Sequence, residues 1–280
     1  MIGAATDALK RRQPPTEDER LKILRITLIA LAIALSMLGW LVWFMPARLA
    51  LAACASRLHG AQLEQVGGSV WHGRAGHVYA ADGTDLGRVR WTLSRRALLG
   101  DVRLHLELDR PGLAASGNIH RLAAGASEWT GVHIEADAAL LDGLPGLEGN
   151  RLHGRLDVHI VDARLQGFWP MKLDAAAHWK GAAVSDSGLS VVLGDFDLQA
   201  HGQGGIVGLR LNDDRRGPLR AEGEAQLSPL AWRYRIDLQP RTTDPALHRW
   251  LARFGRPAPD GVLHLRGSGG LTRWMSHTER

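Results

Sequence analysis

Histidine is the residue type here that most invites a chemical role, because the chain of 280 residues carries 13 of them. Neutral imidazole is a common zinc ligand, and each ligand atom lies about 2 Å from the ion. His153 and His159 share one face of a predicted strand, but at about 3.3 Å per residue they stand roughly 20 Å apart. His72 and His77 fall on opposite faces if their segment is extended. The spacing along the chain therefore predicts surface histidines and no metal site.

The sequence also gives little support for catalysis by a pair of carboxylates. Asp195 and Asp197 lie two residues apart, as a catalytic pair could, but Phe196 and Leu198 alternate with them. That alternation is typical of a strand with one solvated face. The chain also contains no Gly-x-Ser-x-Gly elbow, no phosphate-binding loop ending in Gly-Lys-Ser/Thr and no His-Glu-x-x-His motif. We therefore expect no catalytic residue, no cofactor and no enzymatic activity.

The single cysteine, Cys54, excludes an intramolecular disulfide, so the fold must be stabilised by packing. Leu51-Ala52-Ala53-Cys54 reads like the processing box of a bacterial lipoprotein. However, Cys54 comes ten residues after the end of the preceding apolar segment, and Pro46 and Arg48 lie between them. This separation favours an unprocessed chain with a free thiol.

A segment of 19 uncharged residues, 26–44, is rich in Leu, Ile and Ala. As a helix rising about 1.5 Å per residue it would reach roughly 28 Å, close to the hydrocarbon thickness of about 30 Å. It exceeds the apolar core of about 7 to 15 residues in cleaved signal peptides. Its end at Trp40, Trp43 and Phe44 suits a membrane interface. We predict a transmembrane helix over 26–44; a signal peptide cleaved after Ala50-Leu51-Ala52 is the alternative.

The flanking charges predict the orientation of this helix. Basic side chains are more frequent before the segment than after it, where Arg48 and Arg57 are the close ones. The positive-inside rule therefore places residues 1–25 in the cytoplasm as a short tail. The remaining chain would lie on the other side of the membrane, which is the periplasm if the source is a Gram-negative bacterium. The basic residues before the segment are Lys10, Arg11, Arg12, Arg20, Lys22 and Arg25.

The basic composition does not indicate nucleic-acid binding. The chain has 34 basic and 29 acidic side chains, and residues 1–25 hold 6 and 4 of them. The remainder has 34 − 6 = 28 basic and 29 − 4 = 25 acidic residues, a net charge of only +3. Basic residues that alternate with acidic ones do not form a stripe that follows phosphates. We therefore expect no nucleic-acid partner.

Beyond the apolar segment the sequence pattern changes to a period of two. Residues 45–60 read as a juxtamembrane connector, with Pro46 suited to the first position of a short helix and Gly60 to its end. In residues 61–271, apolar and polar residues alternate, interrupted about every ten residues by Gly, Asp, Asn or Pro. Strands with one apolar face are typical of antiparallel sheets with one packed and one hydrated face. We predict a mainly β fold, a curved antiparallel sheet over 61–271, followed by a polar tail at 272–280.

One short helix interrupts the predicted strands and should cover part of the sheet. Asp244 suits its N-cap, Pro245 its first position, and Gly255 the position after its last turn. Its apolar stripe repeats at helical spacing and consists of Leu247, Trp250, Leu251 and Phe254.

Tryptophan is unusually abundant, with 10 residues. Two lie in the apolar segment, and most of the others are first interpreted as anchors of the core. The functional alternative is that the sheet curves around its apolar face and forms a groove for an acyl chain or a partner strand.

The segment Val66-Gly67-Gly68-Ser69-Val70-Trp71-His72-Gly73-Arg74-Ala75 resembles the Gly-Thr-Leu-Trp-x-Gly-x-Ala phrase of protein N of the type II secretion system. Ser69 and Val70 replace the threonine and leucine of that phrase. The resemblance extends through the N-terminal anchor and the strands to 219–223, 232–238 and the helix at 244–255, so it covers most of the chain.

Membership of that family would imply a bitopic, non-enzymatic inner-membrane subunit of the secretion assembly platform. It would act beside the C, L and M proteins, with the secretin as a further candidate partner. The family motif residues Gly68, Trp71, Gly73 and Arg74 would then be structural, with glycines in tight turns and Trp71 as a core anchor. The strands also resemble AsmA-like envelope proteins, which are generally longer and have a hydrophobic groove. That likeness implies the alternative of a periplasmic lipid or peptide binding protein in envelope maintenance.

Overall fold

The structure, a computed structural model, describes residues 28–29, 31–37, 39–40, 43, 45–48, 62–81, 83–142, 151–186 and 189–270. The predictions made for the tail at 1–25, for Cys54 and for the polar tail at 272–280 lie outside these residues. Between 28 and 43, all described residues are helical, and their side chains are exposed. Within the described part of the chain, we find no helix with the length and apolar character needed to cross a membrane.

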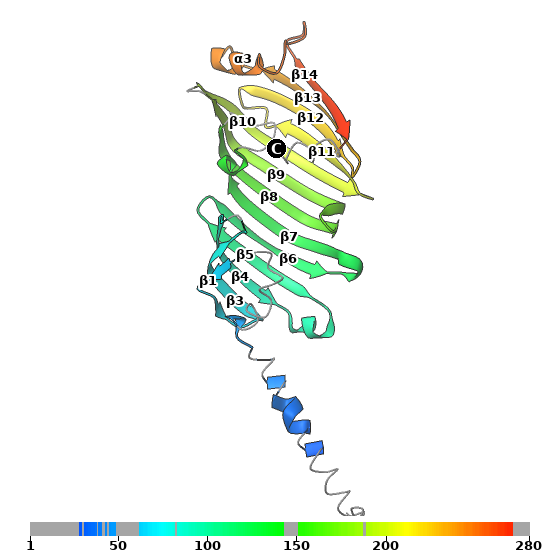
Figure 1. Ribbon diagram of the computed structural model, residues 1–280. Coiled ribbons are helices and arrows are strands. Elements are labelled where there is room, and N and C mark those ends of the chain that lie inside the picture. Colours follow the sequence, from blue (N-terminus) through cyan, green and yellow to red (C-terminus); the bar gives the residue numbers. More distant parts are fainter. Residues whose placement is uncertain are drawn as a thin grey trace, which may run out of the picture.

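The described part of the chain beyond residue 61 forms one open antiparallel sheet of 14 strands (Figure 1). Strand β1 pairs with β3, every strand from β3 to β13 pairs with the next one along the chain, and β2 lies beside β3. The mainly β prediction is therefore confirmed. The strands are β1 Gln62–Glu64, β2 Gly67–Gly68, β3 His72–Tyr79, β4 Asp85–Leu93, β5 Arg103–Arg110, β6 Leu113–Arg121, β7 Ala126–Asp137, β8 Arg151–Gln166, β9 Trp169–Asp186, β10 Leu189–Gln203, β11 Ile206–Asp213, β12 Leu219–Leu227, β13 Ala231–Pro240 and β14 Leu263–Gly270.

Cross-strand pairing keeps the two faces of the sheet distinct. Leu106 of β5, for example, lies opposite Trp91 of β4 and Gly117 of β6. On the other face, Glu107 lies opposite Arg90 and Ser116. Because side chains alternate between faces, the regular stretches of the sheet have one apolar face and one polar face, and bulges interrupt the alternation in several pairings. The described short helices lie between strands: η2 Arg95–Leu99, η3 Ala123–Gly125, η4 Ala138–Leu141 and α3 Pro245–Leu251.

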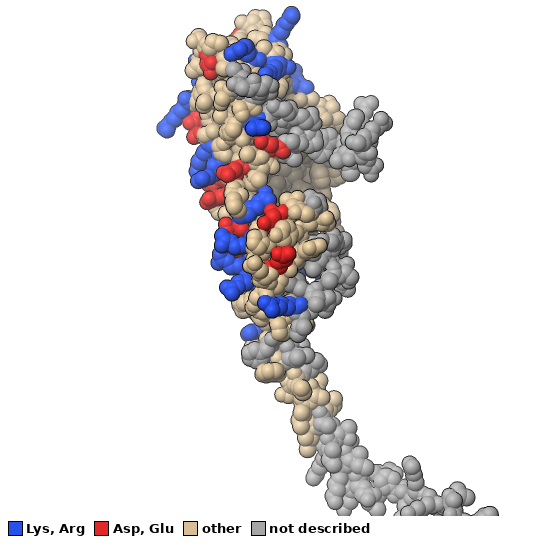
Figure 2. Space-filling model, turned by 60° about the vertical axis from the view of Figure 1, so that its left-hand side comes forward, with Lys and Arg blue, Asp and Glu red and all other residues tan. Residues whose placement is uncertain are grey.

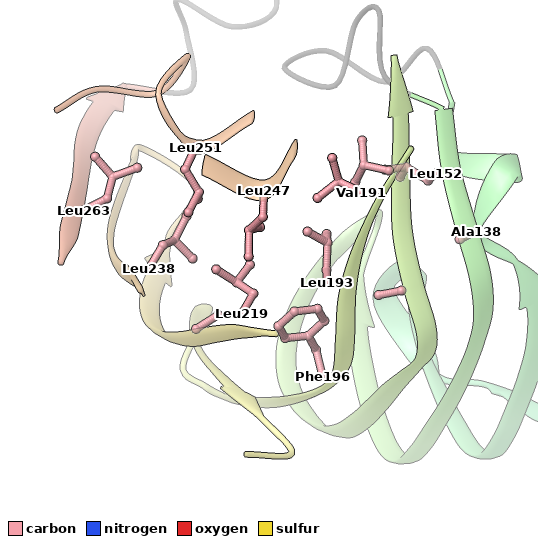
Figure 3. Close-up of a cluster of buried hydrophobic side chains, with 13 residues drawn as sticks. Ala138, Leu152, Val191, Leu193, Phe196, Leu219, Leu238, Leu247, Leu251 and Leu263 are labelled. Carbon is pink, nitrogen blue, oxygen red and sulfur yellow. The ribbon is translucent and has the colours of Figure 1, made fainter. Parts of the chain in front are cut away.

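Most buried side chains belong to one group near α3, here called the C-terminal cluster (Figure 3). Leu247 of α3 is fully buried, and in Figure 3 it lies between Leu219 and Leu193, which come from different strands. The sheet thus curls around its apolar face, and α3 closes the curled end. The cluster consists of Ala138, Leu152, Ala182, Val184, Val191, Leu193, Phe196, Leu219, Ala221, Leu238, Leu247, Leu251 and Leu263.

Helix α3 begins as the sequence predicts and ends earlier. The Asp244 carboxylate accepts a hydrogen bond from the Ala246 N–H at 2.8 Å, and Pro245 occupies the first turn. After Leu251, the N–H groups of Arg253 and Phe254 donate to carbonyls three residues back, so the chain tightens into turns. The helix therefore does not continue to Gly255. Leu247 and Leu251 are buried, Trp250 is half-buried, and Phe254 is 44% exposed.

An ion pair between buried Asp213 and partly exposed Arg241 lies beside the C-terminal cluster. Asp213 Oδ2 accepts a hydrogen bond from Arg241 Nη1 at 2.6 Å and another from the Arg215 N–H at 2.7 Å. Its Oδ1 accepts from the Ala221 N–H at 3.1 Å. Burial by itself raises the pKa of this carboxyl, but the hydrogen bonds from Arg241 and the two backbone groups outweigh it and lower the pKa below its ordinary value.

A second, smaller group of buried residues, here called the N-terminal cluster, lies at the other end of the sheet. It contains Ala47, Val66, Ala75 and Val78. Half-buried Leu63, Leu86, Val89 and Trp91 pack against it. Ala47 comes from the segment that follows the apolar helix, so this segment is part of the core at the start of the sheet.

Candidate functional site

The motif at residues 66–75 forms the junction between the sheet and the segment Met45–Arg48. The Val70 N–H donates to the Met45 carbonyl at 3.1 Å, and Pro46 pairs with Ser69 in an isolated antiparallel bridge. Arg48 Nε donates to the Val66 carbonyl at 2.7 Å. Ala47, which lies between them, is 1% exposed. The motif therefore attaches the chain that leaves the apolar helix to the first strands of the sheet.

Trp71 is buried at this junction, with 4% of its surface exposed. Its carbonyl accepts a hydrogen bond from the Leu93 N–H at 2.8 Å, which ties it to the end of β4. A second indole, that of Trp91, donates its Nε1–H to the Val70 carbonyl at 3.0 Å. The Trp71 carbonyl and the Trp91 indole thus tie the backbone of the motif to β4.

The motif glycines provide space and backbone conformation for these contacts. Gly68 has φ +84°, and a Cβ there would stand 2.4 Å from the His72 carbonyl oxygen. A Cβ on Gly73 would stand 2.1 Å from a ring carbon of Trp91. Neither position can accept a side chain without displacing its neighbour. The structure thus brings Gly68, Trp71 and Gly73 together at one junction.

Arg74, the fourth motif residue, lies on the polar face. It is exposed and stands opposite Gly67 and Arg90 in the strand register. It borders a shallow hollow of about 450 Å³, together with His105 and Glu107. The structural role expected for Arg74, as for the other motif residues, stays a prediction.

Helix η2 extends the junction toward the apolar helix. The Arg95 guanidinium stacks over the Trp43 ring, with its carbon 3.7 Å from the ring centroid. Leu98 and Leu99 of η2 are 59% and 88% exposed. Exposed leucines and an arginine thus lie on the short helix that contacts Trp43.

The polar face carries a larger hollow of about 940 Å³ over β8 to β14. Its lining is rich in arginine: Arg210 comes from β11, Arg233 and Arg235 from β13, and Arg266 from β14. Arg210 lies 3.7 Å from the carboxylate of Glu224. Figure 2 shows how Lys and Arg side chains mix with Asp and Glu along one side of the molecule. The hydrated face is therefore mixed in charge, with a local basic excess in this hollow.

The two aspartates considered for catalysis, Asp195 and Asp197, have separate structural partners. Asp195 Oδ1 accepts a hydrogen bond from the Gly181 N–H at 2.6 Å, next to an irregularity in the pairing of β9 and β10. Asp197 pairs with His178 across the same two strands. Each carboxylate is thus engaged with β9, which fits the predicted solvated strand face.

The structure also brings together two histidines from different strands, a pair that spacing within one strand does not reveal. His133 of β7 and His159 of β8 are direct partners in the strand register, and their rings lie 4.3 Å apart. The sequence argument compared histidines within a strand and so missed this pair. Alternation placed His159 on the polar face of its strand, but the register between β7 and β8 depends on the long connection at 138–150, and local sequence does not determine that register.

Residues 59–266 match the family model for the type II secretion system (T2SS), protein N. The chain belongs to this family. The match runs from the connector to β14, and it confirms the resemblance carried by the Trp71 motif. Comparisons with curated proteins and with solved structures found no match. Membership of the protein N family implies a type II secretion component that associates with other secretion components, consistent with the cell envelope.

Proposed function

We propose that this protein N is a non-enzymatic accessory or scaffolding subunit of the inner-membrane assembly platform of type II secretion. In that role it supports export of folded proteins across the outer membrane and contacts the C, L or M proteins. The observation that carries the proposal is the family match over 59–266, because this range contains strands β1 to β13 and the first half of β14.

We further propose a single-pass topology, with a cytoplasmic N-terminus, a membrane helix over 26–44 and a periplasmic sheet. The charge asymmetry around the apolar segment supports this orientation. The exposed apolar side chains of the described helical residues between 28 and 43 also support it. In this arrangement Trp43, Arg95 and the exposed leucines of η2 lie at the membrane surface, where aromatic and basic side chains are favoured.

Two experiments test this proposal. Affinity isolation from mildly solubilised membranes should recover a C, L or M protein, and repeated isolation without any platform component would remove the scaffolding role. A periplasm-dependent reporter should be active when fused after Gly60 and inactive when fused before Lys22. The reverse pattern would overturn the orientation.

A second candidate function, binding of a lipid or peptide, is favoured by the apolar face of β5 to β7. This region lies between the two clusters, and α3 packs on β10 while η4 packs on β8. Several of its large apolar side chains are only half-buried: Leu104, Leu106, Leu108, Ile119 and Ile134. If this face holds an acyl chain, mass spectrometry of the protein purified in lipid-free detergent should show a bound lipid. Protein free of lipid under these conditions would count against this candidate.

A further inference from the structure

Three side chains on the polar face of β7 and β8 converge on one point. His133 Nδ1 and His159 Nδ1 lie 3.2 Å apart. Asp157 Oδ1 lies 3.5 Å from His133 Nδ1 and 3.0 Å from His159 Nε2. Taking one ligand atom from each residue, all three atoms lie within 4.8 Å of one another. The strand register creates this arrangement, because His133 pairs with His159 and Glu135 pairs with Asp157.

These separations are those of ligands around a small metal ion. In a tetrahedral zinc site with bonds of about 2.0 to 2.1 Å, neighbouring ligand atoms stand about 3.3 Å apart. Two of the observed distances lie close to that value: 3.2 Å between the two Nδ1 atoms and 3.5 Å between Asp157 Oδ1 and His133 Nδ1. The 3.0 Å contact of Asp157 Oδ1 is with the other ring nitrogen of His159, Nε2, which is the alternative ligand atom of that ring. Hydrogen bonding satisfies these three side chains less well than a zinc ion would, because the facing nitrogens of the two imidazoles can share only one proton.

The carboxylate supplies a separate indication. Asp157 Oδ1 is buried and accepts no hydrogen bond. Buried acceptors without a partner are rare, and an ion is one explanation for such an atom. The other oxygen, Oδ2, faces Lys180, whose Nζ lies 3.8 Å away. Lys180 therefore lies beside Oδ2, and Oδ1 faces the two histidines.

Glu135 is not one of the three proposed ligands, but it contacts one of them, His133. Its Oε1 lies 3.1 Å from His133 Nε2. A carboxylate that accepts a hydrogen bond from the Nε2–H group fixes the tautomer in which Nδ1 carries the lone pair. Metal-binding histidines commonly have such a partner. Glu135 and Asp157 carry two negative charges against the one positive charge of Lys180, which lies beside Asp157. This excess of negative charge favours a divalent cation.

We propose that His133, Asp157 and His159 bind one zinc ion that links β7 to β8. Two imidazole nitrogens and one carboxylate suit zinc better than magnesium or calcium, which prefer oxygen ligands. His159 also lines the large polar hollow, so the proposed site borders that hollow. This inference does not depend on the proposed role in the secretion platform.

The experiment uses the full-length chain in detergent, purified through a histidine-free tag and stripped of metal with a chelator. Zinc chloride is titrated in competition with a chromogenic chelator, and Co²⁺ is added separately to record the visible absorption of a tetrahedral site. The wild type should bind one tight equivalent of zinc. His159→Gln and Asp157→Asn should each abolish this equivalent, and Glu135→Gln should weaken it about 10- to 100-fold.

The matched control is His264→Gln. His264 Nδ1 lies 2.7 Å from Asp237 Oδ1 on the same face, but no second histidine completes a group of three there among the described residues. This variant should keep the tight zinc equivalent and the Co²⁺ spectrum. The thermal midpoint of each variant without metal shows that its fold is intact. Absence of tight zinc in the wild type, or its persistence in His159→Gln and Asp157→Asn, would overturn the proposal. Equal loss in His264→Gln would do the same.

Discussion

The two ends of the sheet complete their cores in different ways. Among the described residues, the C-terminal cluster has 13 buried members and is closed by α3, which lies between β13 and β14 in the same half of the chain. The N-terminal cluster has 4 members in the same described part, and one of them, Ala47, belongs to the segment after the apolar helix. The C-terminal end is thus covered by its own sequence, whereas the N-terminal end requires the connector. Anchoring and folding are therefore linked at the N-terminal end.

The largest expected effect is at the junction. Trp71→Ala removes a buried aromatic side chain and should lower the free energy of unfolding by about 3 to 5 kcal/mol. Denaturant unfolding, followed by fluorescence and circular dichroism, measures the change. Trp43→Ala is the control, because Trp43 is exposed and should contribute little to the stability of the sheet. Unchanged unfolding of Trp71→Ala would assign Trp71 to recognition, and binding to a partner should then weaken by about 2 kcal/mol or more.

At the other end, Leu247→Ala should lower the free energy of unfolding by about 3 kcal/mol, because it leaves a cavity under α3. Phe254→Ala, at a position 44% exposed, should cost less than about 1 kcal/mol. The same unfolding measurement compares the two variants. Equal losses of unfolding free energy in the two variants would mean that the packing of Leu247 does not hold α3 on the C-terminal cluster.

The ion pair beside the C-terminal cluster should make stability depend on acid. The pKa of Asp213 is lowered in the folded chain, so its contribution is present above the unfolded pKa of about 3.9 and is lost as pH falls through the folded value. Arg241→Met removes the cation, and burial should then raise the pKa of Asp213. We expect a loss of about 2 kcal/mol at neutral pH, less than for a fully buried pair because Arg241 is partly exposed.

The measurement for this pair is the free energy of unfolding between pH 3 and about pH 7. Acid destabilisation should begin at higher pH in Arg241→Met than in the wild type. The double variant Asp213→Asn with Arg241→Met should lose this difference. Identical pH profiles of the wild type and Arg241→Met would show that the pair does not control acid stability.

The smallest predicted effect concerns the start of α3. Asp244→Ala removes the N-cap hydrogen bond to the Ala246 N–H and should cost about 1 kcal/mol. Thr242→Ala, an exposed position two residues earlier, is the control and should change little. Thermal unfolding of both variants provides the test. A cost for Asp244→Ala no larger than that of the control would show that the cap does not stabilise the cover of the C-terminal cluster.

Local features of the fold were readable from the sequence, and features that depend on register were not. Strand alternation and the Asp244 cap follow from neighbouring residues, and both are present in the structure. The end of α3 at Leu251 was not predicted, because the following turns retain a helix-like pattern. The pairing of His133 with His159 depends on how two long strands align, and local sequence does not determine that alignment. The burial of Ala47 depends likewise on contacts with distant residues.

The order of the strands also bears on how the chain folds. From β3 onward each strand pairs with its neighbours along the chain, so most backbone partners lie one hairpin away. Closing short loops costs less conformational entropy than joining distant segments, and topologies rich in local contacts fold faster. The sheet can therefore assemble one hairpin at a time, with each completed strand serving as the template for the next.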